Sequence, residues 1–182
     1  YINDHKLGFH PYGYSPFYFD ITEHLNKGDQ DNSITVKIDH RRYADSRWYT
    51  GAGIYRNVKM ITTSKLHIPV WGTFVTTPKV SEEKALTKID LTVNNEFDKE
   101  VQFTLKTTVF DSNGKEINSV SETASMGGKS QNTFSQHIEI SKPKLWSIDT
   151  PNLYTAKTEI IRDGKIIDTY DTRYGIRSIE FD

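Results

Sequence analysis

The stretch DSRWYTGAGIYRNVKM, residues 45–60, gathers the residue types best suited to contacting a polar ligand. Asp45, Arg47, Trp48 and Tyr49 stand together at its start. The faces of Trp and Tyr pack against sugar C–H groups, and an Arg guanidinium donates hydrogen bonds to hydroxyl or carboxylate oxygens. These four residues are therefore candidates for a carbohydrate-contacting rim.

A structural interpretation accounts for the same stretch. Its two glycines permit a bend or a bulge at the head of a strand. Ile54 and Val58 would then pack inward, while Tyr55 and Arg56 would shield an edge. The residue types alone leave both interpretations open.

Two other motifs have catalytic or metal-binding potential, but each has a simpler interpretation. Asn95-Glu96 is the dipeptide that marks the acid/base in many glycosidases, yet it lies in a polar run between two alternating segments. We interpret it as an exposed hairpin loop and not as a catalytic pair. DSNGKE, residues 111–116, lacks the ligand positions of a calcium loop and is typical of a bulged turn.

The remaining chemistry-bearing residues predict no metal or cofactor site in this chain. The six His residues show neither HxH nor HExxH spacing, and GxSxG and Gly-rich phosphate loops are missing. The sequence contains no cysteine, which excludes disulfides and thiolate zinc sites.

Charge and hydropathy argue against two classes of partner. Lys plus Arg (23) nearly cancel Asp plus Glu (24), and the net charge of −1 provides no general attraction to nucleic acid or anionic membranes. A membrane span needs about 18 or more apolar residues in a row, and the sequence contains no such run. We expect neither nucleic acid nor a membrane as a partner.

The elements that must position the rim are β-strands, because apolar residues alternate with polar ones along most of the chain. This alternation predicts half-buried strands at 34–38, 89–93 and 101–109. Three turn sequences separate further strands: SNGK at 112–115, MGGK at 126–129 and RDGK at 162–165. The last predicts a hairpin. Only DITEHLNKG suggests a helix, with Thr22 as N-cap and Gly28 as its stop.

The strand pattern predicts two all-β units with a boundary between residues 65 and 66. The segment 66–182 has about the size and the roughly seven strands of an immunoglobulin-like β-sandwich. We expect Trp146 to be its buried anchor. The segment 1–65 is an incomplete sandwich with too small a core, so we expect it to continue upstream or to depend on the second unit.

Four blocks in this order resemble glycoside hydrolase family 2, especially its β-galactosidases. YINDHKLG is similar to an N-G-x-x-x-G hairpin of that family, with Asp4 where Gly is more frequent. GFHPYGYSPFYFDITEHLNKGDQDNSITVKID and SRWYTGAGIYRNVKM resemble the end of its N-terminal jelly-roll sugar-binding domain. PKLWSIDTPNLYTAKTEI and RYGIRSIEFD are similar to the closing strands of its immunoglobulin-like second domain.

The resemblance implies a part of a larger enzyme. In the family, a (β/α)8 barrel carries two catalytic glutamates that hydrolyse terminal β-galactosides with retention. Neither glutamate would lie in this chain, which should be inactive alone. Residues 1–65 and 66–182 would support the barrel of the same polypeptide and shape its substrate opening.

The resemblance also bears on the candidate rim. Many relatives offer an Asp to the sugar from the segment ahead of their G-I-x-R strand. Alignment on GIYRNV places Arg47 at that position and Asp45 two residues earlier, so the resemblance leaves open which of them contacts substrate. Trp48 and Tyr49 would contact either the sugar or the barrel.

Alternatives to the β-galactosidase part stay open. One is a self-sufficient carbohydrate-binding module, and another is a different family 2 specificity, β-glucuronidase or β-mannosidase. A plain interaction sandwich would leave SRWYTGAGIYRNV unexplained. Family members with this motif often act on external glycans, which favours a periplasmic or extracellular setting and leaves a cytoplasmic one open.

Overall fold

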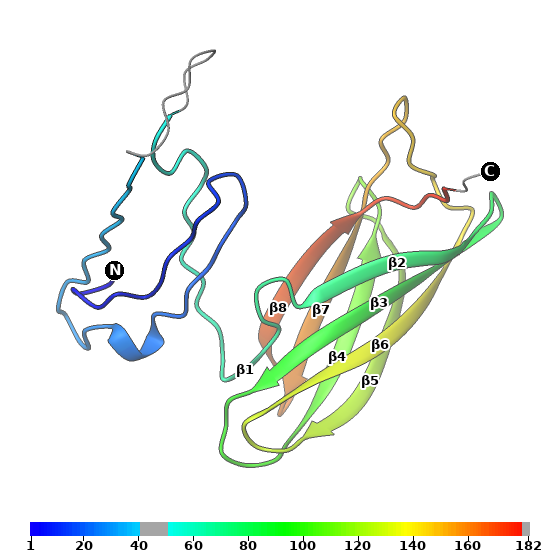
Figure 1. Cartoon of the computed structure of the whole chain (residues 1–182). Helices are drawn as coiled ribbons and strands as arrows, with labels where there is room; N and C mark the ends of the chain where they lie inside the picture. The colour runs from blue at the N-terminus through cyan, green and yellow to red at the C-terminus, as the bar shows by residue number, and fades with distance from the viewer. Residues whose placement is uncertain (41–50, 180–182) are drawn as a thin grey trace. The chain divides into compact units, whose positions relative to one another are not determined.

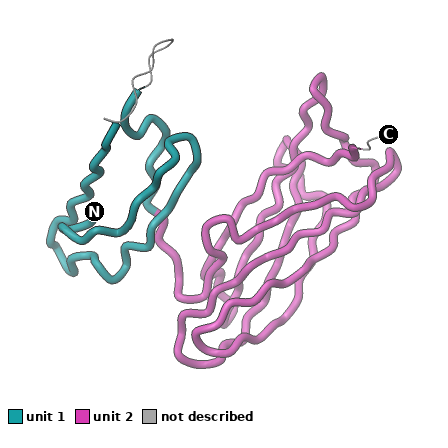
Figure 2. Tube along the Cα trace, in the orientation of Figure 1, with its two compact units in different colours: residues 1–60 teal, residues 61–182 magenta. Residues whose placement is uncertain are grey.

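The computed structural model describes residues 1–40 and 51–179, and its regular elements are almost all β-strands (Figure 1). The all-β fold class predicted from the sequence is confirmed. The chain divides into Tyr1–Met60, called unit 1 here, and Ile61–Asp182, called unit 2 (Figure 2). The sequence predicted a boundary between residues 65 and 66, and the structure divides the chain earlier, after Met60. Among the described residues, none of the helices combines the length and the apolar character needed to cross a membrane.

Unit 2 is a sandwich of two antiparallel sheets. Its strands are β1 Leu66–His67, β2 Thr73–Val80, β3 Lys84–Asn95, β4 Val101–Phe110, β5 Glu116–Met126, β6 Ser130–Ser141, β7 Tyr154–Arg162 and β8 Lys165–Tyr174. In the first sheet β3 pairs with β1, β2 and β6, and the second sheet has the order β5-β4-β7-β8. The predicted strands at 89–93 and 101–109 and the hairpin at 162–165 are confirmed.

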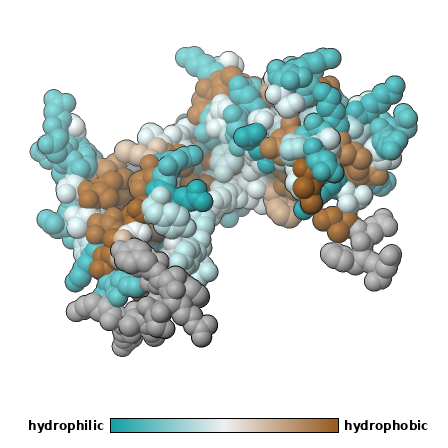
Figure 3. Space-filling view, turned by 90° about the horizontal axis from the view of Figure 1, so that it is seen from above, coloured by the Kyte–Doolittle hydropathy of each residue, from teal (hydrophilic) through white to brown (hydrophobic). Residues whose placement is uncertain are grey.

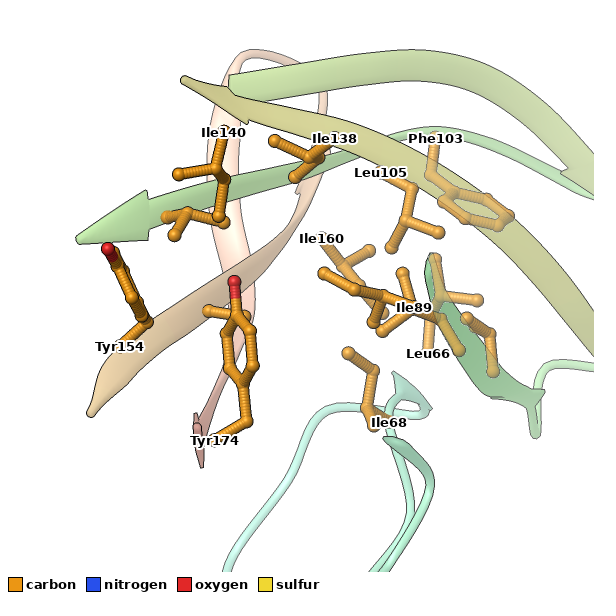
Figure 4. Close-up of a cluster of buried hydrophobic side chains, with 14 of the residues drawn as sticks. Leu66, Ile68, Ile89, Phe103, Leu105, Ile138, Ile140, Tyr154, Ile160 and Tyr174 are labelled. Atoms are coloured by element: carbon orange, nitrogen blue, oxygen red, sulfur yellow. The ribbon is translucent and has the colours of Figure 1, made fainter. Parts of the chain in front are cut away.

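The core of unit 2 forms because each sheet turns its apolar side chains toward the other. In β3 every second residue from Ala85 to Asn95 is buried, and the intervening ones are half-buried. Ile89, Leu105 and Ile160 come from three strands and have no exposed surface (Figure 4). Burial of such a cluster is the main favourable term in folding a sandwich of this size.

Two pairs of buried hydroxyl groups lie within hydrogen-bond distance of each other in this core. The Thr107 hydroxyl lies 2.9 Å from that of Thr158, and the Thr87 hydroxyl lies 3.3 Å from the Tyr174 hydroxyl. Burial raises the pKa of Tyr174 to about 12, because the phenolate would lose its hydration. The Thr87–Tyr174 pair joins β3 of one sheet to β8 of the other, and the Thr107–Thr158 pair joins β4 to β7 within one sheet.

Tyr154 fixes the loop that enters β7. Its hydroxyl accepts a hydrogen bond from the backbone N–H of Lys144 at 2.8 Å. A Tyr at the start of this strand that bonds to the preceding backbone is the tyrosine corner of immunoglobulin-like sandwiches. The predicted immunoglobulin-like fold of the second unit is therefore confirmed in its connection as well as in its sheets.

Unit 1 is irregular and is organised by polar side chains. Asn3 donates from Nδ2 to Asn32 Oδ1 at 2.8 Å and accepts from Ser33 N–H at 2.9 Å. The rings of His5 and His24 stack at 4.7 Å between centroids. Among the residues that the structure describes in unit 1, Ile2 is the single buried hydrophobic one. It forms an isolated β-bridge with Ile34.

The half-buried strand predicted at 34–38 is wrong. Ile34, Val36 and Ile38 are 63%, 51% and 51% exposed, and in the described part of unit 1 they pair only through the bridge at Ile34. Figure 3 shows apolar side chains on the surface of this unit. Alternation provides an apolar face, but burying it requires a second layer that packs against it.

The helix predicted in the same unit is short. It is a single 3-10 turn, η1 Thr22–His24, with Ile21 rather than Thr22 at the N-cap position. The carboxylate of Asp20 accepts a hydrogen bond from Thr22 N–H at 2.9 Å and takes the capping role instead. The prediction that Gly28 stops the helix is wrong, because the turn ends at His24 with an extended Leu25 at the C-cap position, and Gly28 takes its positive φ of 74° in the loop that follows.

Candidate functional site

The four predicted rim residues, Asp45, Arg47, Trp48 and Tyr49, lie outside the described residues, so the rim stays a prediction. The described chain resumes at Gly51, and the flank of the rim is exposed.

The structural interpretation of that flank is wrong for its apolar residues. Ile54 is 48% exposed and Val58 is 72% exposed, so they do not pack inward as that interpretation requires. The Arg56 guanidinium lies 5.7 Å from the ring centroid of Tyr55, which is 65% exposed. This flank presents aromatic, cationic and apolar surface together.

Asn95 ends β3 and Glu96 begins the connection to β4 in the other sheet, so the predicted hairpin loop is wrong at this point. The Asn95 amide donates to the carbonyls of Lys99, Met126 and Gly127 at 3.1, 3.2 and 2.7 Å. Its Oδ1 accepts from Phe97 N–H at 3.0 Å, and the residue is 1% exposed. Asn95 is a structural residue that ties three backbone segments together. This agrees with our rejection of a catalytic role for the dipeptide.

The loop after β4 is a polar turn. Asp111 Oδ1 accepts hydrogen bonds from the backbone N–H groups of Asn113 and Lys115 at 2.9 and 3.0 Å. The bond from Lys115, followed by the bond from Asn113, lowers the pKa of the Asp111 carboxyl despite some opposing desolvation. Within residues 1–40 and 51–179, no group of three or more His, Asp or Glu side chains could hold a metal ion.

Trp146 and Arg177 form a cluster beside a hollow of about 280 Å³, which is lined by these two residues and Gly175. Trp146 lies in the loop between β6 and β7, and Arg177 follows β8. The Trp146 N–H donates to the Ile176 carbonyl at 2.8 Å, and the Arg177 guanidinium lies 4.8 Å from the indole centroid. A Cβ on Gly175 would lie 2.9 Å from three atoms of Trp146, so only glycine permits this approach.

The prediction that Trp146 is the buried anchor of unit 2 is wrong. Trp146 is half-buried, because it stands in a loop at the end of the sandwich rather than at a core-facing strand position. Its contacts with Gly175 and Arg177 instead hold the segment after β8 against the β6–β7 loop. Sequence reasoning did not single out Gly175 or Arg177, although a glycine two positions before an arginine at a strand end was the available signal.

Comparison with known proteins decides the family. A sequence profile described as "Glycosyl hydrolases family 2" matches residues 66–177. The chain belongs to glycosyl hydrolase family 2. The part of the chain that carries the profile match coincides with the sandwich of unit 2.

Family 2 relatives cover the whole chain. A β-galactosidase of Bacteroides ovatus, BoGH2A, is 37% identical over 182 residues, which is 100% of this chain and 21% of that protein. A protein named putative β-glucuronidase from Formosa agariphila is 34% identical over 178 residues, which is 98% of this chain and 16% of that protein. The chain therefore spans about a fifth or less of these two relatives.

Solved family 2 structures share the fold. A member from Bacteroides cellulosilyticus superimposes with a TM-score of 0.90 at 33% identity and covers 100% of this chain and 25% of its own. A β-glucuronidase from Bacteroides uniformis gives a TM-score of 0.86 at 27% identity and covers 100% of this chain and 23% of its own. Both likenesses cover the whole chain, unit 1 included.

Proposed function

We propose that this chain is a non-catalytic part of a β-galactosidase-type family 2 enzyme, which hydrolyses terminal β-galactosides with retention in its full length. The observation that carries the proposal is 37% identity to a β-galactosidase across the entire chain, which spans 21% of that relative. The chain would support the catalytic barrel of the same polypeptide and shape its substrate opening. The β-galactoside that is hydrolysed would be bound by the full-length enzyme, at the substrate opening that this chain helps to shape.

The surroundings of the candidate carboxylates support a non-catalytic role. Retaining glycosidases need two carboxyl groups about 5 to 5.5 Å apart across the scissile bond. Glu96 is exposed in a connection whose Asn95 amide is occupied by backbone groups, and Asp111 accepts hydrogen bonds within its own turn. Neither lies in an arrangement that would activate it as an acid or a nucleophile.

A second candidate specificity is β-glucuronidase. It is favoured by the Formosa agariphila relative, which is 34% identical, and by the Bacteroides uniformis structure. β-Mannosidase is a further specificity that the sequence resemblance leaves open. We propose a periplasmic or extracellular setting for the enzyme, and we propose that this chain works without a cofactor.

The proposal is tested with three chromogenic substrates, a β-galactoside, a β-glucuronide and a β-mannoside. Each is given to the full-length enzyme and to the 182-residue chain. We expect the full-length enzyme to cleave the β-galactoside and the chain alone to cleave none. If the full-length enzyme preferred the β-glucuronide, β-glucuronidase would replace β-galactosidase as the proposed specificity. Hydrolysis by the chain alone would overturn the non-catalytic role. Glu96→Gln in the full-length enzyme is the control, and its turnover should equal that of the parent.

The rim prediction has its own test in the full-length enzyme. Trp48→Ala should raise KM for a β-galactoside or loosen the contact with the barrel, while unit 2 unfolds at the same temperature as before. Trp71→Ala is a matched change at an exposed Trp of unit 2, 58% exposed, and should leave KM unchanged. If Trp48→Ala and Trp71→Ala changed KM equally, the prediction that Trp48 belongs to the rim would be wrong.

A further inference from the structure

A second hollow, of about 380 Å³, lies on the outer face of the β5-β4-β7-β8 sheet at the end of β4. Its volume falls at the low end of the range of about 300 to 1,000 Å³ usual for small-molecule sites. It is lined by Phe110, Asp111, Ser112, Gly114, Leu153, Thr155, Lys157, Asp171 and Arg173. All of these residues belong to unit 2, and none of them is part of the predicted rim.

Strand register places the lining side chains in two rows. Phe110 pairs with Thr155, which pairs with Arg173, and this row crosses β4, β7 and β8. Lys157 pairs with Asp171 in the next row. Residues directly opposite each other on paired strands project to the same face. The aromatic ring and the charged groups are therefore brought together by the sheet, although they are far apart in sequence.

The charged side chains at this hollow are balanced. The side chains of Asp171 and Arg173 make no hydrogen bond or ion pair with any residue that the structure describes. Lys157 Nζ lies 3.2 Å from Glu159 Oε1, which leaves further N–H donors on the ammonium. Asp111 is held as a carboxylate by its turn. Two carboxylates thus face two cations.

This balance selects the chemistry of a ligand. For an anion such as phosphate, repulsion from Asp111 and Asp171 offsets attraction to Lys157 and Arg173, and for a cation the two effects are exchanged. A neutral ligand rich in hydroxyl groups can accept from the cations and donate to the carboxylates. The half-buried Phe110 and Leu153 provide apolar surface for the C–H side of such a ligand.

We propose that this hollow is a carbohydrate-binding site for a neutral hexopyranoside, which would hold one sugar unit of a glycan on unit 2. The choice of a β-galactoside as probe rests on the proposed function. The hollow is shallow and exposed, so we expect a dissociation constant on the order of millimolar.

Titration of the ¹⁵N-labelled 182-residue chain with methyl β-D-galactopyranoside, followed by amide chemical shifts, tests the proposal. We expect saturable shifts at residues 110–114, 153–157 and 171–173. Inorganic phosphate, titrated separately at constant ionic strength, should cause no saturable shift there. Saturation by phosphate instead of the sugar, or sugar-induced shifts confined to other residues, would overturn the proposal, as would the lack of any saturable shift.

Two charge-removing variants sharpen this test. Asp171→Asn and Arg173→Gln should each weaken sugar binding about tenfold or more, because each removes a charge-assisted hydrogen bond. Asp163→Asn and Lys165→Gln, in the turn before β8 and at its start, are matched controls and should bind as the parent does. Thermal unfolding of all four confirms that the fold is intact. Equal binding by Asp171→Asn, Arg173→Gln and the parent would contradict the site.

The two proposals fail separately. Hydrolysis is measured as turnover by the full-length enzyme and sugar binding as amide shifts of unit 2, so a failed titration leaves the glycosidase proposal in place. If the full-length enzyme did not hydrolyse β-galactosides, the proposed function would be wrong, but sugar binding at the hollow could still be observed in the titration.

Discussion

Residues 34–38 of unit 1 and residues 89–93 of unit 2 alternate apolar and polar side chains in the same way. Their apolar positions differ completely in burial, being 51% to 63% exposed in the first segment and 0% exposed in the second. The second segment lies in β3, which pairs with β2 and β6 and faces another sheet. Local pattern thus provides the face of a strand, and neighbouring strands and layers determine whether that face is buried.

The two units also differ in how they use polar residues. In unit 2 the buried Asn95 ties backbone segments together, whereas in unit 1 the exposed Asn32 and the half-buried Asn3 hold loops together. A hydrogen bond contributes more where leaving it unmade would bury an unsatisfied group. The same residue type should therefore matter more in unit 2.

The largest difference between the units should come from truncating an apolar side chain in each. Leu105→Ala, at a position with 0% exposure, should lower the free energy of unfolding by about 2 to 5 kcal/mol through lost burial and a residual cavity. Val36→Ala, at 51% exposure, should change it by no more than about 0.5 kcal/mol. Urea unfolding followed by circular dichroism measures both, and equal losses would show that unit 1 packs as tightly as unit 2.

Alkaline pH should destabilise unit 2 through Tyr174. Burial raises its pKa to about 12, while an unfolded tyrosine ionises near pH 10. Between these values the unfolded chain releases a proton that the folded chain keeps, so stability is complete below about pH 10 and falls by roughly 2 to 3 kcal/mol as pH rises toward 12.

Tyr174→Phe should remove that loss from the pH dependence of urea unfolding. Tyr14→Phe, at a residue of unit 1 that is 72% exposed, is the matched control and should unfold with the pH dependence of the parent. If the alkaline loss persisted in Tyr174→Phe, the buried hydroxyl would not be its cause.

Asn95→Ala should lower the free energy of unfolding by roughly 1 to 3 kcal/mol, because buried carbonyl and N–H groups lose their partner. Asn32→Ala makes the same change at the exposed centre of the unit 1 loops, where water can replace the side chain, and should cost about 0.5 kcal/mol or less. Thermal and urea unfolding compare the two variants. A larger loss of stability from Asn32→Ala than from Asn95→Ala would show that this residue type matters more in unit 1.

The smallest effect concerns the contact at the end of the sandwich. A double-mutant cycle with Trp146→Ala and Arg177→Ala should give a coupling energy of about 0.5 to 1 kcal/mol, as for a cation stacked on a partly exposed ring. Urea unfolding of the parent, the two single variants and the double variant provides the four values. Additive losses would show that the stacked pair is not coupled.

Part of unit 2 was predictable because its signals are local. Alternation located β3 and β4, and the Arg162–Lys165 sequence located the β7–β8 hairpin, in which Asp163 and Gly164 take positive φ of 51° and 73°. The two turn residues follow from the conformational freedom of Gly and Asp, which acts over four residues. Local signals cannot identify hydrogen-bond partners that are distant in sequence, such as those of Asn95 at Met126 and Gly127. For this reason Asn95 was wrongly predicted to lie in a hairpin loop.

The candidate sites divide along the same line. The residue types at 45–49 indicated a rim from composition alone, whereas the hollow at Phe110 and Arg173 joins residues from strands that are distant in sequence. No spacing within one segment predicts which residues of β4, β7 and β8 share a row, because strand order and register determine it. The cluster of Trp146 with Arg177 arises in the same way from a loop and a strand end.

The sequence by itself determined the all-β class, several strands and turns, and the family, because alternation, turn chemistry and ordered motifs are all written in local residue order. Only the tertiary structure decided which apolar faces are buried, that Asn95 links the two sheets, and that Trp146 stacks with Arg177 at the surface. The physical reason is that burial and long-range hydrogen bonds depend on which segments meet, and that choice is made by the packing of whole sheets.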